Sequence, residues 1–403
     1  MAHSNASTQF SATDPALGYL YQIRSALFWA LQRLKSTSDF LVSIEILDDV
    51  TFETAGGKPT ELLQTKHHLT AKANLTDAST DLWKTLRIWC EGTASEAIPE
   101  TANLILVTTG AAQDNSIASK LRATDRDVDG AVQSLTSVAN SSTNESNKNA
   151  YKAFLALSDS ERKAILRRVT IVDAASTIDD LGKSLRAEVF WASGKDHHDA
   201  FLQRLEGWWY RRVLTQLADR DGGRIGSVEI EAMMSDLREE FKRDSLPIDD
   251  DLLDFTLDDT TAAAHSGSVF VKQLDLVKAG KRRIAIAIRD YFRAYEQRSR
   301  WLREDLIVEL ELHKYEKRLI EEWEVIFEAM RDELGDDAAQ TERESAARSV
   351  LTWAERTTIP VRPTVTEPFV TRGSLQMLAD EVRIGWHPEF QNRLEAILNA
   401  EEE

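Results

Sequence analysis

The chain has 403 residues, 42% hydrophobic and 29% charged, a composition typical of a folded protein with two or three domains rather than of a disordered chain. It carries 49 Lys and Arg against 67 Asp and Glu, a formal net charge of −18, so it has no bulk attraction for nucleic acid. The single cysteine, Cys90, excludes a disulfide framework and a cysteine-rich zinc site, and the lack of a membrane-length apolar stretch or a signal peptide predicts a cytoplasmic protein without a membrane partner.

The first part of the chain predicts a helix followed by a β-hairpin. Residues 16–35 place apolar side chains three and four apart, as one face of a helix requires. Residues 40–53 alternate in polarity and are rich in β-branched side chains, which predicts a strand that turns near Asp48 and Asp49. After a turn that contains Gly and Pro, residues 60–68 predict a second strand that pairs with the first.

A second helix and a buried strand follow the hairpin. Residues 79–92 predict an amphipathic helix, and the wholly apolar run at 103–109 predicts a short strand in the centre of a sheet. This order of elements describes a small α/β domain. The stretch at 137–149 is mostly Ser and Asn without apolar periodicity, which predicts a flexible linker or loop.

The next segment leaves the end of this domain open. Residues 158–166 predict a helix, 168–172 a strand and 177–191 a further helix. The whole segment at 150–193 either completes the first domain or bridges to a second one. We place the boundary so that residues 1–195 form the α/β domain.

From there to the C-terminus, at 196–403, the pattern is almost entirely helical. Amphipathic helices are predicted at 201–217 and 228–244. The longest pattern runs through 282–334 without Gly or Pro, and either one continuous helix or two helices with a break near 298–302 would fit it. We therefore predict a second domain that is mainly α-helical.

The polar residues of the hairpin form a candidate site. Side chains alternate along a strand, so Glu45 and Asp49 are expected on one face of the first strand, and Gln64 and Lys66 on one face of the second. Hydrolysis of a phosphodiester by a metal ion needs carboxylates that hold Mg²⁺ and a lysine that orients the attacking water. The combination indicates such a site, although a Gln-x-Lys triplet or an Asp-Asp pair alone is also common on solvated strands and turns.

Other chemistries find less support. The residues at 182–184 resemble the end of a Walker A loop, but Thr177 stands where that loop has Gly, so we expect no ATPase activity. A Gly-x-Ser-x-Gly motif is absent. The adjacent histidine pairs at 67–68 and 197–198 have no cysteines nearby and are expected on the surface.

Four motifs in this order resemble one nuclease family. They are GYLYQ at 18–22, IEILDDV at 44–50, QTK at 64–66 and DLWKTLRIW at 81–89. Together they resemble the PD-(D/E)xK restriction-endonuclease-like fold, in the variant where Gln replaces the acid of the Glu-x-Lys element. More narrowly, they are similar to the double-stranded DNA endonuclease domain of anti-phage effectors in CBASS and Lamassu systems, and the likeness covers roughly residues 14–110.

The resemblance implies a role for each polar residue of the hairpin. Asp49 matches the metal-binding acid, Gln64 the metal-shell position and Lys66 the catalytic lysine. Glu45 matches a further position at the metal, and Gln22 a supporting position in the same site. The implied cofactor is Mg²⁺, with Mn²⁺ as the alternative. Gln in place of the acid leaves fewer anionic ligands, so metal affinity is expected to be weak until DNA supplies phosphate oxygens.

The C-terminal half carries a second resemblance. The stretches at 206–213, 271–277 and 289–323 are similar to the C-terminal domain of ABC-three-component systems. In those systems an effector is paired with an SMC-like ATPase and a small middle subunit. Most of the aromatic side chains in these stretches are expected in the core, and exposed ones would anchor partners.

Lamassu systems join these two halves, so the resemblance implies a metal-dependent double-stranded DNA endonuclease that acts as the effector of a Lamassu-like complex. The ATPase and the middle subunit are expected to hold it inactive. The net charge of −18 implies that activity needs release into a homo-oligomer, or the basic surface of another chain. Two other interpretations stay open: a non-catalytic adaptor with a nuclease-like scaffold, and a CBASS-type nuclease effector gated by a nucleotide signal.

Overall fold

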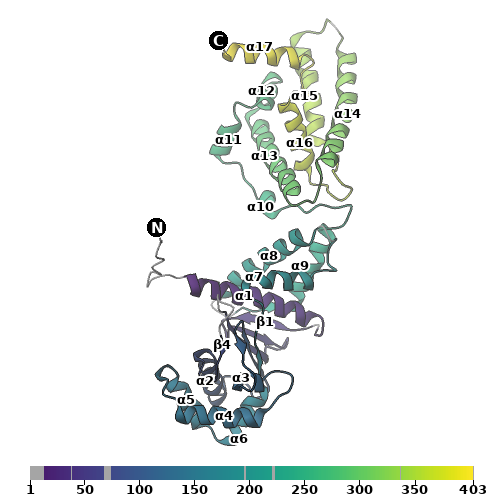
Figure 1. The fold of residues 1–403 in the computed structure, drawn as a ribbon. Coiled ribbons are helices and arrows are strands. Elements are labelled where there is room, and N and C mark those ends of the chain that lie inside the picture. Colours follow the sequence, from purple (N-terminus) through teal and green to yellow (C-terminus); the bar gives the residue numbers. More distant parts are fainter. Residues whose placement is uncertain are drawn as a thin grey trace, which may run out of the picture. The chain divides into compact units, whose positions relative to one another are not determined.

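The computed structural model describes residues 13–37, 39–67, 74–194, 197–219, 223–335 and 337–402. The chain divides into two compact units (Figure 1). Unit 1 consists of Met1–Ala192 and Phe201–Asp236, and unit 2 consists of Ser193–Ala200 and Leu237–Glu403. Unit 1 contains helices and a β-sheet and unit 2 is helical, so the prediction of an α/β part followed by a mainly helical part is confirmed at this level.

A six-stranded sheet lies at the centre of unit 1. Its strands are β1 (Leu41–Ile44), β2 (Val50–Glu53), β3 (Pro59–Lys66), β5 (Asn103–Thr108), β7 (Val169–Val172) and β8 (Ile225–Gly226), in the order β7-β5-β3-β2-β1-β8. The first three strands pair antiparallel, β8 adds antiparallel to β1, and β5 and β7 add in parallel beyond β3. The apolar strand β5 therefore has a neighbour on each side, as predicted, and Leu104 and Leu106 are fully buried.

Helices cover both faces of this sheet (Figure 1). On one side, α1 (Thr13–Leu34) packs with α7 (Ile178–Glu188). On the other side, α2 (Thr80–Ala94) buries Trp83, Leu86 and Trp89 in the same core as the strands, which fixes its position against the sheet. The remaining elements are β4 (Asn74–Leu75), β6 (Ala111–Ala112), α3 (Ile117–Lys120), α4 (Val128–Ser141), η1 (Glu145–Asn147), α5 (Lys148–Ala156), α6 (Asp159–Arg168), α8 (His198–Ala218) and α9 (Ser227–Glu240).

The polar stretch at 137–149 is mostly helical, which corrects the prediction of a flexible linker there. Its residues end α4, form η1 and begin α5, and its polar side chains serve as caps and tertiary contacts. Asn144 accepts a hydrogen bond from the backbone N–H of Ser146. Asn147 is buried and donates to the carbonyl of Ala78 at 2.9 Å. Ser and Asn stabilise turns and helix starts through such bonds, so their abundance did not mean disorder.

The segment at 201–236 packs with unit 1, although the sequence placed it in the helical domain. Its strand β8 pairs with β1 at the edge of the sheet. The side chain of Gln216 bonds both backbone groups of Ile44, at 3.0 Å and 3.2 Å, and Trp209 Nε1 donates to the carbonyl of Ile23 at 2.8 Å. The segment at 150–193, which the sequence left open, lies with unit 1 as far as Ala192, because β7 pairs with β5.

Unit 2 consists of helices in the part of the chain that the structure describes. They are α10 (Asp250–Leu253), α11 (Asp259–His265), α12 (Val269–Leu276), α13 (Lys281–Arg303), α14 (Glu309–Leu334), α15 (Gln340–Arg356), α16 (Pro368–Asp380) and α17 (Phe390–Glu402). The long pattern at 282–334 is thus two helices. The break follows α13, where Asp305 has a φ of 55° and the N–H of Leu306 donates to the carbonyl of Trp301 at 2.9 Å. Across the described ranges, no helix combines the length and apolar character needed to cross a membrane.

The closest helix packing in unit 2 is between α13 and α16. Gly373 of α16 lies against α13, and a Cβ atom added there would stand 2.0 Å from the carbonyl oxygen of Asp290 and 2.5 Å from the Cβ of Ala294. Arg372 Nε donates to the buried Asp290 carboxylate at 2.7 Å beside this contact. The backbones can approach this closely only because position 373 lacks a side chain.

We therefore expect Gly373→Ala to destabilise unit 2. Overpacking of this kind costs about 1–3 kcal/mol or more, because α13 and α16 must separate. Urea unfolding followed by circular dichroism measures the effect. Gly267→Ala is the matched control, because an added Cβ there has no heavy atom within 4 Å. Equal unfolding midpoints for the two variants would contradict the assigned packing.

Candidate functional site

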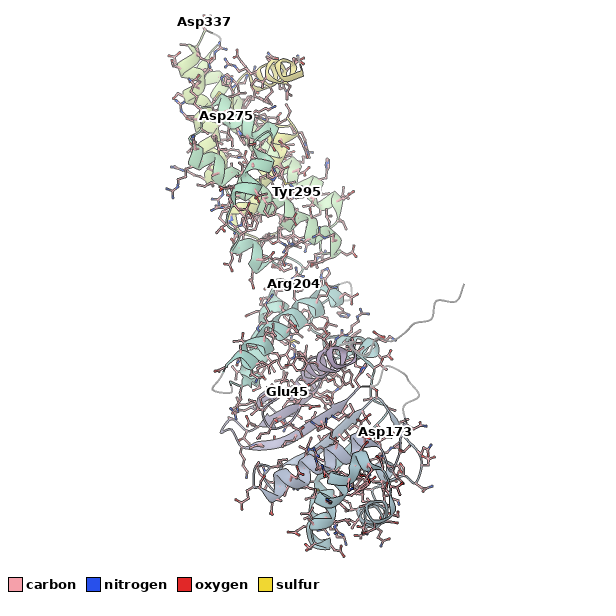
Figure 2. All side chains as sticks on the ribbon, turned by 90° about the vertical axis from the view of Figure 1, so that its left-hand side faces the viewer. Glu45, Asp173, Arg204, Asp275, Tyr295 and Asp337 are labelled. Carbon is pink, nitrogen blue, oxygen red and sulfur yellow. The ribbon has the colours of Figure 1, made fainter. Side chains whose placement is uncertain are left out.

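The connection between β1 and β2 carries the acidic residues of the site. The sequence predicted that Glu45 and Asp49 lie on one strand face, but β1 ends at Ile44 and residues 45–49 form a bend. Glu45 has a left-handed φ of 58°, and its N–H donates to the carbonyl of Asp49 at 3.2 Å, which closes the bend. Glu45 thus lies beside the sheet of unit 1 (Figure 2). The acids share one side of the site because this loop folds back and not because strand positions alternate.

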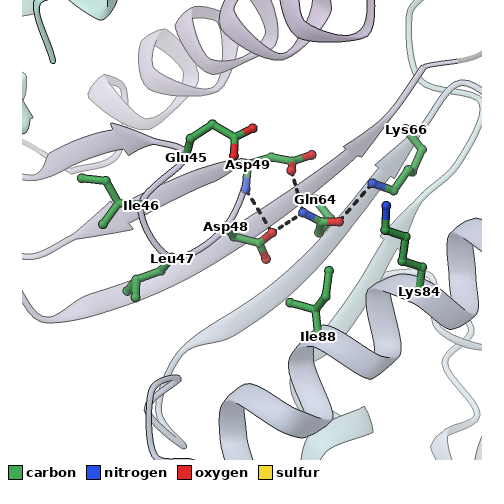
Figure 3. A pocket seen from close by; sticks show the side chains of 9 residues that line it. All are labelled: Glu45, Ile46, Leu47, Asp48, Asp49, Gln64, Lys66, Lys84 and Ile88. Carbon is green, nitrogen blue, oxygen red and sulfur yellow. Dashed lines mark hydrogen bonds between the residues drawn. The ribbon is translucent and has the colours of Figure 1, made fainter. Parts of the chain in front are cut away.

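Asp49, Gln64 and Lys66 come together as the sequence analysis expected. Gln64 Nε2 donates to Asp49 Oδ1 at 2.6 Å, and Lys66 Nζ donates to Gln64 Oε1 at 3.0 Å (Figure 3). Gln64 and Lys66 occupy the same face of β3, two residues apart, so this contact follows from the alternation of side chains along the strand. Thr65 lies between them and donates its N–H and its hydroxyl to Asp49 Oδ2, at 2.7 Å and 3.0 Å.

Gln22 and Glu45 form the outer part of the site. Gln22 is buried on α1, and its Nε2 donates to Glu45 Oε1 at 2.9 Å and to the backbone carbonyl of Asp49 at 2.7 Å. Its amide therefore holds both ends of the bend at 45–49. Glu45 is exposed and lines the same pocket as Asp49.

Asp48 is the residue that the sequence analysis did not assign. Its carboxylate is buried and accepts hydrogen bonds from Trp89 Nε1 at 2.8 Å, from the N–H of Asp49 at 3.0 Å and from Gln64 Nε2. Burial raises the pKa of Asp48 to about 6, and the neighbouring Asp49 charge adds to the rise, while the bonds from Trp89 and Gln64 act against it. Its place beside Asp49 was visible in the sequence, but its pairing with Trp89 was not.

These residues surround one open pocket of about 290 Å³. The pocket is lined by Glu45, Ile46, Leu47, Asp48, Asp49, Gln64, Lys66, Lys84 and Ile88. Its carboxylates lie on one side and the amines of Lys66 and Lys84 on the other, with the Gln64 amide between them (Figure 3). The amide nitrogen of Gln64 faces the acids and its oxygen faces Lys66, so this side chain separates the two charges.

The donor set fits a divalent cation that shares its coordination with substrate. Mg²⁺ prefers oxygen ligands and is commonly held by one or two carboxylates together with substrate phosphates. Asp48 and Asp49 supply adjacent carboxylates. Gln64 would supply its amide oxygen after a rotation of the amide, because in this structure its nitrogen faces the acids and its oxygen faces Lys66. Within the described residues no group of three or more His, Cys, Asp or Glu side chains is placed to hold a metal ion. A cation bound here would therefore need oxygen atoms from another molecule to complete its coordination.

One family match covers the helical part of the chain. Residues 270–394 match the C-terminal domain 7 of the ABC-three component (ABC-3C) systems. The predicted likeness to the C-terminal domain of these systems is thus confirmed for 270–394, while the stretch at 206–213 lies outside the match. The match concerns this part of unit 2 and identifies it as similar to a domain of multi-component systems.

Among solved structures, the chain is similar to the Cap4 SAVED/CARF-domain containing receptor of Acinetobacter baumannii. With the receptor bound to the cyclic trinucleotide 2'3'3'-cAAA, the match has 13% identity and a TM-score of 0.35, and covers 55% of this chain and 45% of the receptor. A second receptor structure gives 11% identity and a TM-score of 0.35 and covers 69% and 60%. The chain thus spans less than two thirds of the receptor, and a likeness at this level carries no argument about function. No curated protein sequence matches the chain.

The raised pKa of Asp48 makes stability depend on pH. Because the pKa of this carboxyl rises from 3.8 to about 6 on folding, the folded protein holds a proton between these values that the unfolded chain has released. The stability contributed by this group therefore falls as the pH rises through that window and is constant above it. Relative to Asp48→Asn, which does not titrate, the wild type should lose up to about 3 kcal/mol of unfolding free energy between about pH 4 and pH 7.

Urea unfolding at a series of pH values measures this difference. Asp114→Asn, at an exposed position of unit 1, is the matched control and should follow the wild type. If Asp48→Asn and Asp114→Asn show the same dependence on pH, Asp48 is not a buried titrating group in the folded protein.

Proposed function

We propose that unit 1 is a nuclease that hydrolyses double-stranded DNA with Mg²⁺, or with Mn²⁺ in its place. The observation that carries the proposal is the convergence of Asp49, Gln64 and Lys66 on one open pocket, joined by hydrogen bonds of 2.6 Å and 3.0 Å. The carboxylate is a ligand for a hard cation, the amide of Gln64 can turn its oxygen toward the same cation, and the amine of Lys66 is a donor for an anionic oxygen.

Each residue has a distinct role in this proposal. Asp49 holds the cation, with Glu45 and Gln64 assisting, and Asp48 adds a second carboxylate that is ionised above about pH 6. Lys66 orients the attacking water and offsets the charge that develops on the phosphate. A bound Mg²⁺ would supply Lewis-acid polarisation of the phosphate and a more acidic water. Gln22 keeps the bend at 45–49 closed through its two hydrogen bonds.

The arrangement of elements supports the proposed PD-(D/E)xK assignment. Helix α1 comes before the antiparallel strands β1, β2 and β3, and α2 leads to β5, which lies parallel to β3. The residue patterns of the sequence predicted a helix, two paired strands, a helix and a strand, and the first of those two predicted strands is divided into β1 and β2. The pocket lies where the connection from β1 to β2 meets the carboxyl end of β3.

We further propose that this nuclease is the effector of a Lamassu-like anti-phage complex in the cytoplasm. The match of residues 270–394 to a C-terminal domain of ABC-3C systems supports the presence of further subunits. In the proposal an SMC-like ATPase and a small middle subunit hold the nuclease inactive. A chain with a net charge of −18 repels DNA, so release into a homo-oligomer would concentrate the few local amines that favour binding.

A non-catalytic adaptor is the second candidate, and two observations favour it. Within the described residues no three acidic or histidine side chains are placed around one metal position. Both carboxylate oxygens of Asp49 already accept hydrogen bonds from Gln64 or Thr65. In this case the polar cluster would only hold β3 against the bend.

Plasmid cleavage with Mg²⁺ tests the two candidates. If Lys66 takes part in hydrolysis, Lys66→Ala should lower the cleavage rate by about 100-fold or more, because the developing charge loses its positive partner. Lys58→Ala, in the exposed turn between β2 and β3, is the matched control and should cleave like the wild type. The assay is run with the chain alone and together with its partner subunits. Absence of cleavage in every condition, with cell toxicity unaffected by Lys66→Ala, would favour the adaptor.

A further inference from the structure

A second amine faces the pocket, from a different element than Lys66. Lys84 belongs to α2, and its side chain extends toward the same side of the pocket as Lys66 (Figure 3). Ile88, one helical turn further along, lines the pocket as well. The helix that carries Lys84 is held in place by the buried Trp89, whose indole N–H donates to Asp48 at 2.8 Å. The backbone position of Lys84 is therefore held by the same contact that positions Asp48.

Three of the six described lysines on the helices of unit 1 pair with carboxylates, and Lys84 is not one of these three. Lys148 bonds Glu145 at 3.0 Å, Lys183 bonds Asp180 at 2.8 Å and Lys163 pairs with Asp129. Among the residues that the structure describes, Lys84 forms no ion pair with a carboxylate, and its side chain is exposed at the pocket. This is notable in a chain that has 67 acidic residues against 49 basic ones. Two amines close together repel each other, so an anion bound between or next to them lowers the electrostatic energy of both.

The pocket has an acidic side and a basic side. If one phosphate of a substrate binds through a cation at Asp48 and Asp49, the basic side remains available for the next phosphate of the same molecule. Lys66 already donates to Gln64 at 3.0 Å, whereas Lys84 has all three of its hydrogen-bond donors available. Lysine acts as a point charge toward phosphate, so it tolerates different orientations of a polymer backbone.

We propose that Lys84 is a substrate-binding residue that contacts the phosphate next to the one at the carboxylates. This inference rests on the proposed nuclease function and specifies its substrate class, a polymer with at least two successive phosphodiesters. It also gives a chain with a net charge of −18 a local contact with DNA. Lys84 acts on binding, whereas Lys66 acts on turnover.

Binding and cleavage by the full-length chain test this assignment together. Affinity for a short labelled DNA duplex is measured by fluorescence anisotropy in Ca²⁺ over a range of salt concentrations, and kcat and KM for cleavage are measured in Mg²⁺. Lys84→Ala should bind about tenfold more weakly and raise KM with little change in kcat. The slope of log affinity against log salt should fall by about 0.9, as expected for one lost phosphate contact. Lys84→Arg should restore most of the affinity, because it keeps the charge.

Lys152→Ala is the matched control, because Lys152 is an exposed helical lysine of α5 outside the pocket lining. Wild-type salt slope and KM in Lys84→Ala would overturn the assignment, even if the wild type cleaves DNA. Binding that depends on Lys84 without any cleavage in Mg²⁺ would uphold it and reject the proposed nuclease activity. A wild type that neither binds nor cleaves the duplex, both alone and together with its partner subunits, would reject both.

Discussion

The hydrogen bonds of the buried Asp48 carboxylate join the three elements that form the candidate site. Asp48 lies in the bend between β1 and β2, Gln64 lies on β3 and Trp89 lies on α2, and both partners donate to this one carboxylate. Burial makes such a group costly to leave without partners, so the bend, the strand and the helix are held in one arrangement. The same three elements carry Asp49, Lys66 and Lys84, so this arrangement brings their side chains to one pocket.

The charge of the whole chain and the charges at the pocket have different effects on the binding of an anionic polymer. The net charge of −18 opposes binding of an anionic polymer. At the pocket, Lys66 and Lys84 face the same side, and the Gln64 amide separates them from the acids. Charge at contact distance outweighs charge that salt screens over about 8–10 Å, so the local arrangement decides what the pocket can bind. In the proposed function the local amines provide the contact with DNA, and assembly supplies the additional affinity that a chain of this net charge needs.

The division of the chain into units also has a physical cause. Residues 201–236 follow a segment assigned to unit 2, yet they complete the sheet of unit 1 through β8 and anchor to it through Trp209 and Gln216. Gln216 satisfies the backbone groups of Ile44 at the point where β1 ends and the acidic bend begins. The helix that the sequence assigned to a partner-binding domain therefore supports the candidate site. The family match at 270–394 lies wholly within unit 2, whereas the stretch at 206–213, which the sequence analysis grouped with it, lies in unit 1.

The sequence by itself determined most helices and strands near the site. It also predicted that Asp49, Gln64 and Lys66 come together. Helical and strand periodicities differ, so α1, β3, α2 and β5 could be predicted from the spacing of apolar side chains. Gln64 and Lys66 had to share a face because side chains alternate on a strand. Polar composition was a weaker guide, since the Ser and Asn residues at 137–149 cap helices rather than form a linker.

Only the tertiary structure decided how Asp48, Lys84 and the segment at 201–236 take part. Asp48 and Trp89 are 41 residues apart, and Gln216 and Ile44 are 172 apart, so no local pattern connects them. The bend at 45–49 replaced a predicted strand because Glu45 adopts a left-handed conformation that its side chain does not favour by itself. The periodicity of apolar residues indicates which face of a helix or strand is buried. It does not indicate which other element covers that face, because this depends on packing between segments that are distant in the sequence. That packing placed the carboxylates and amines around one pocket.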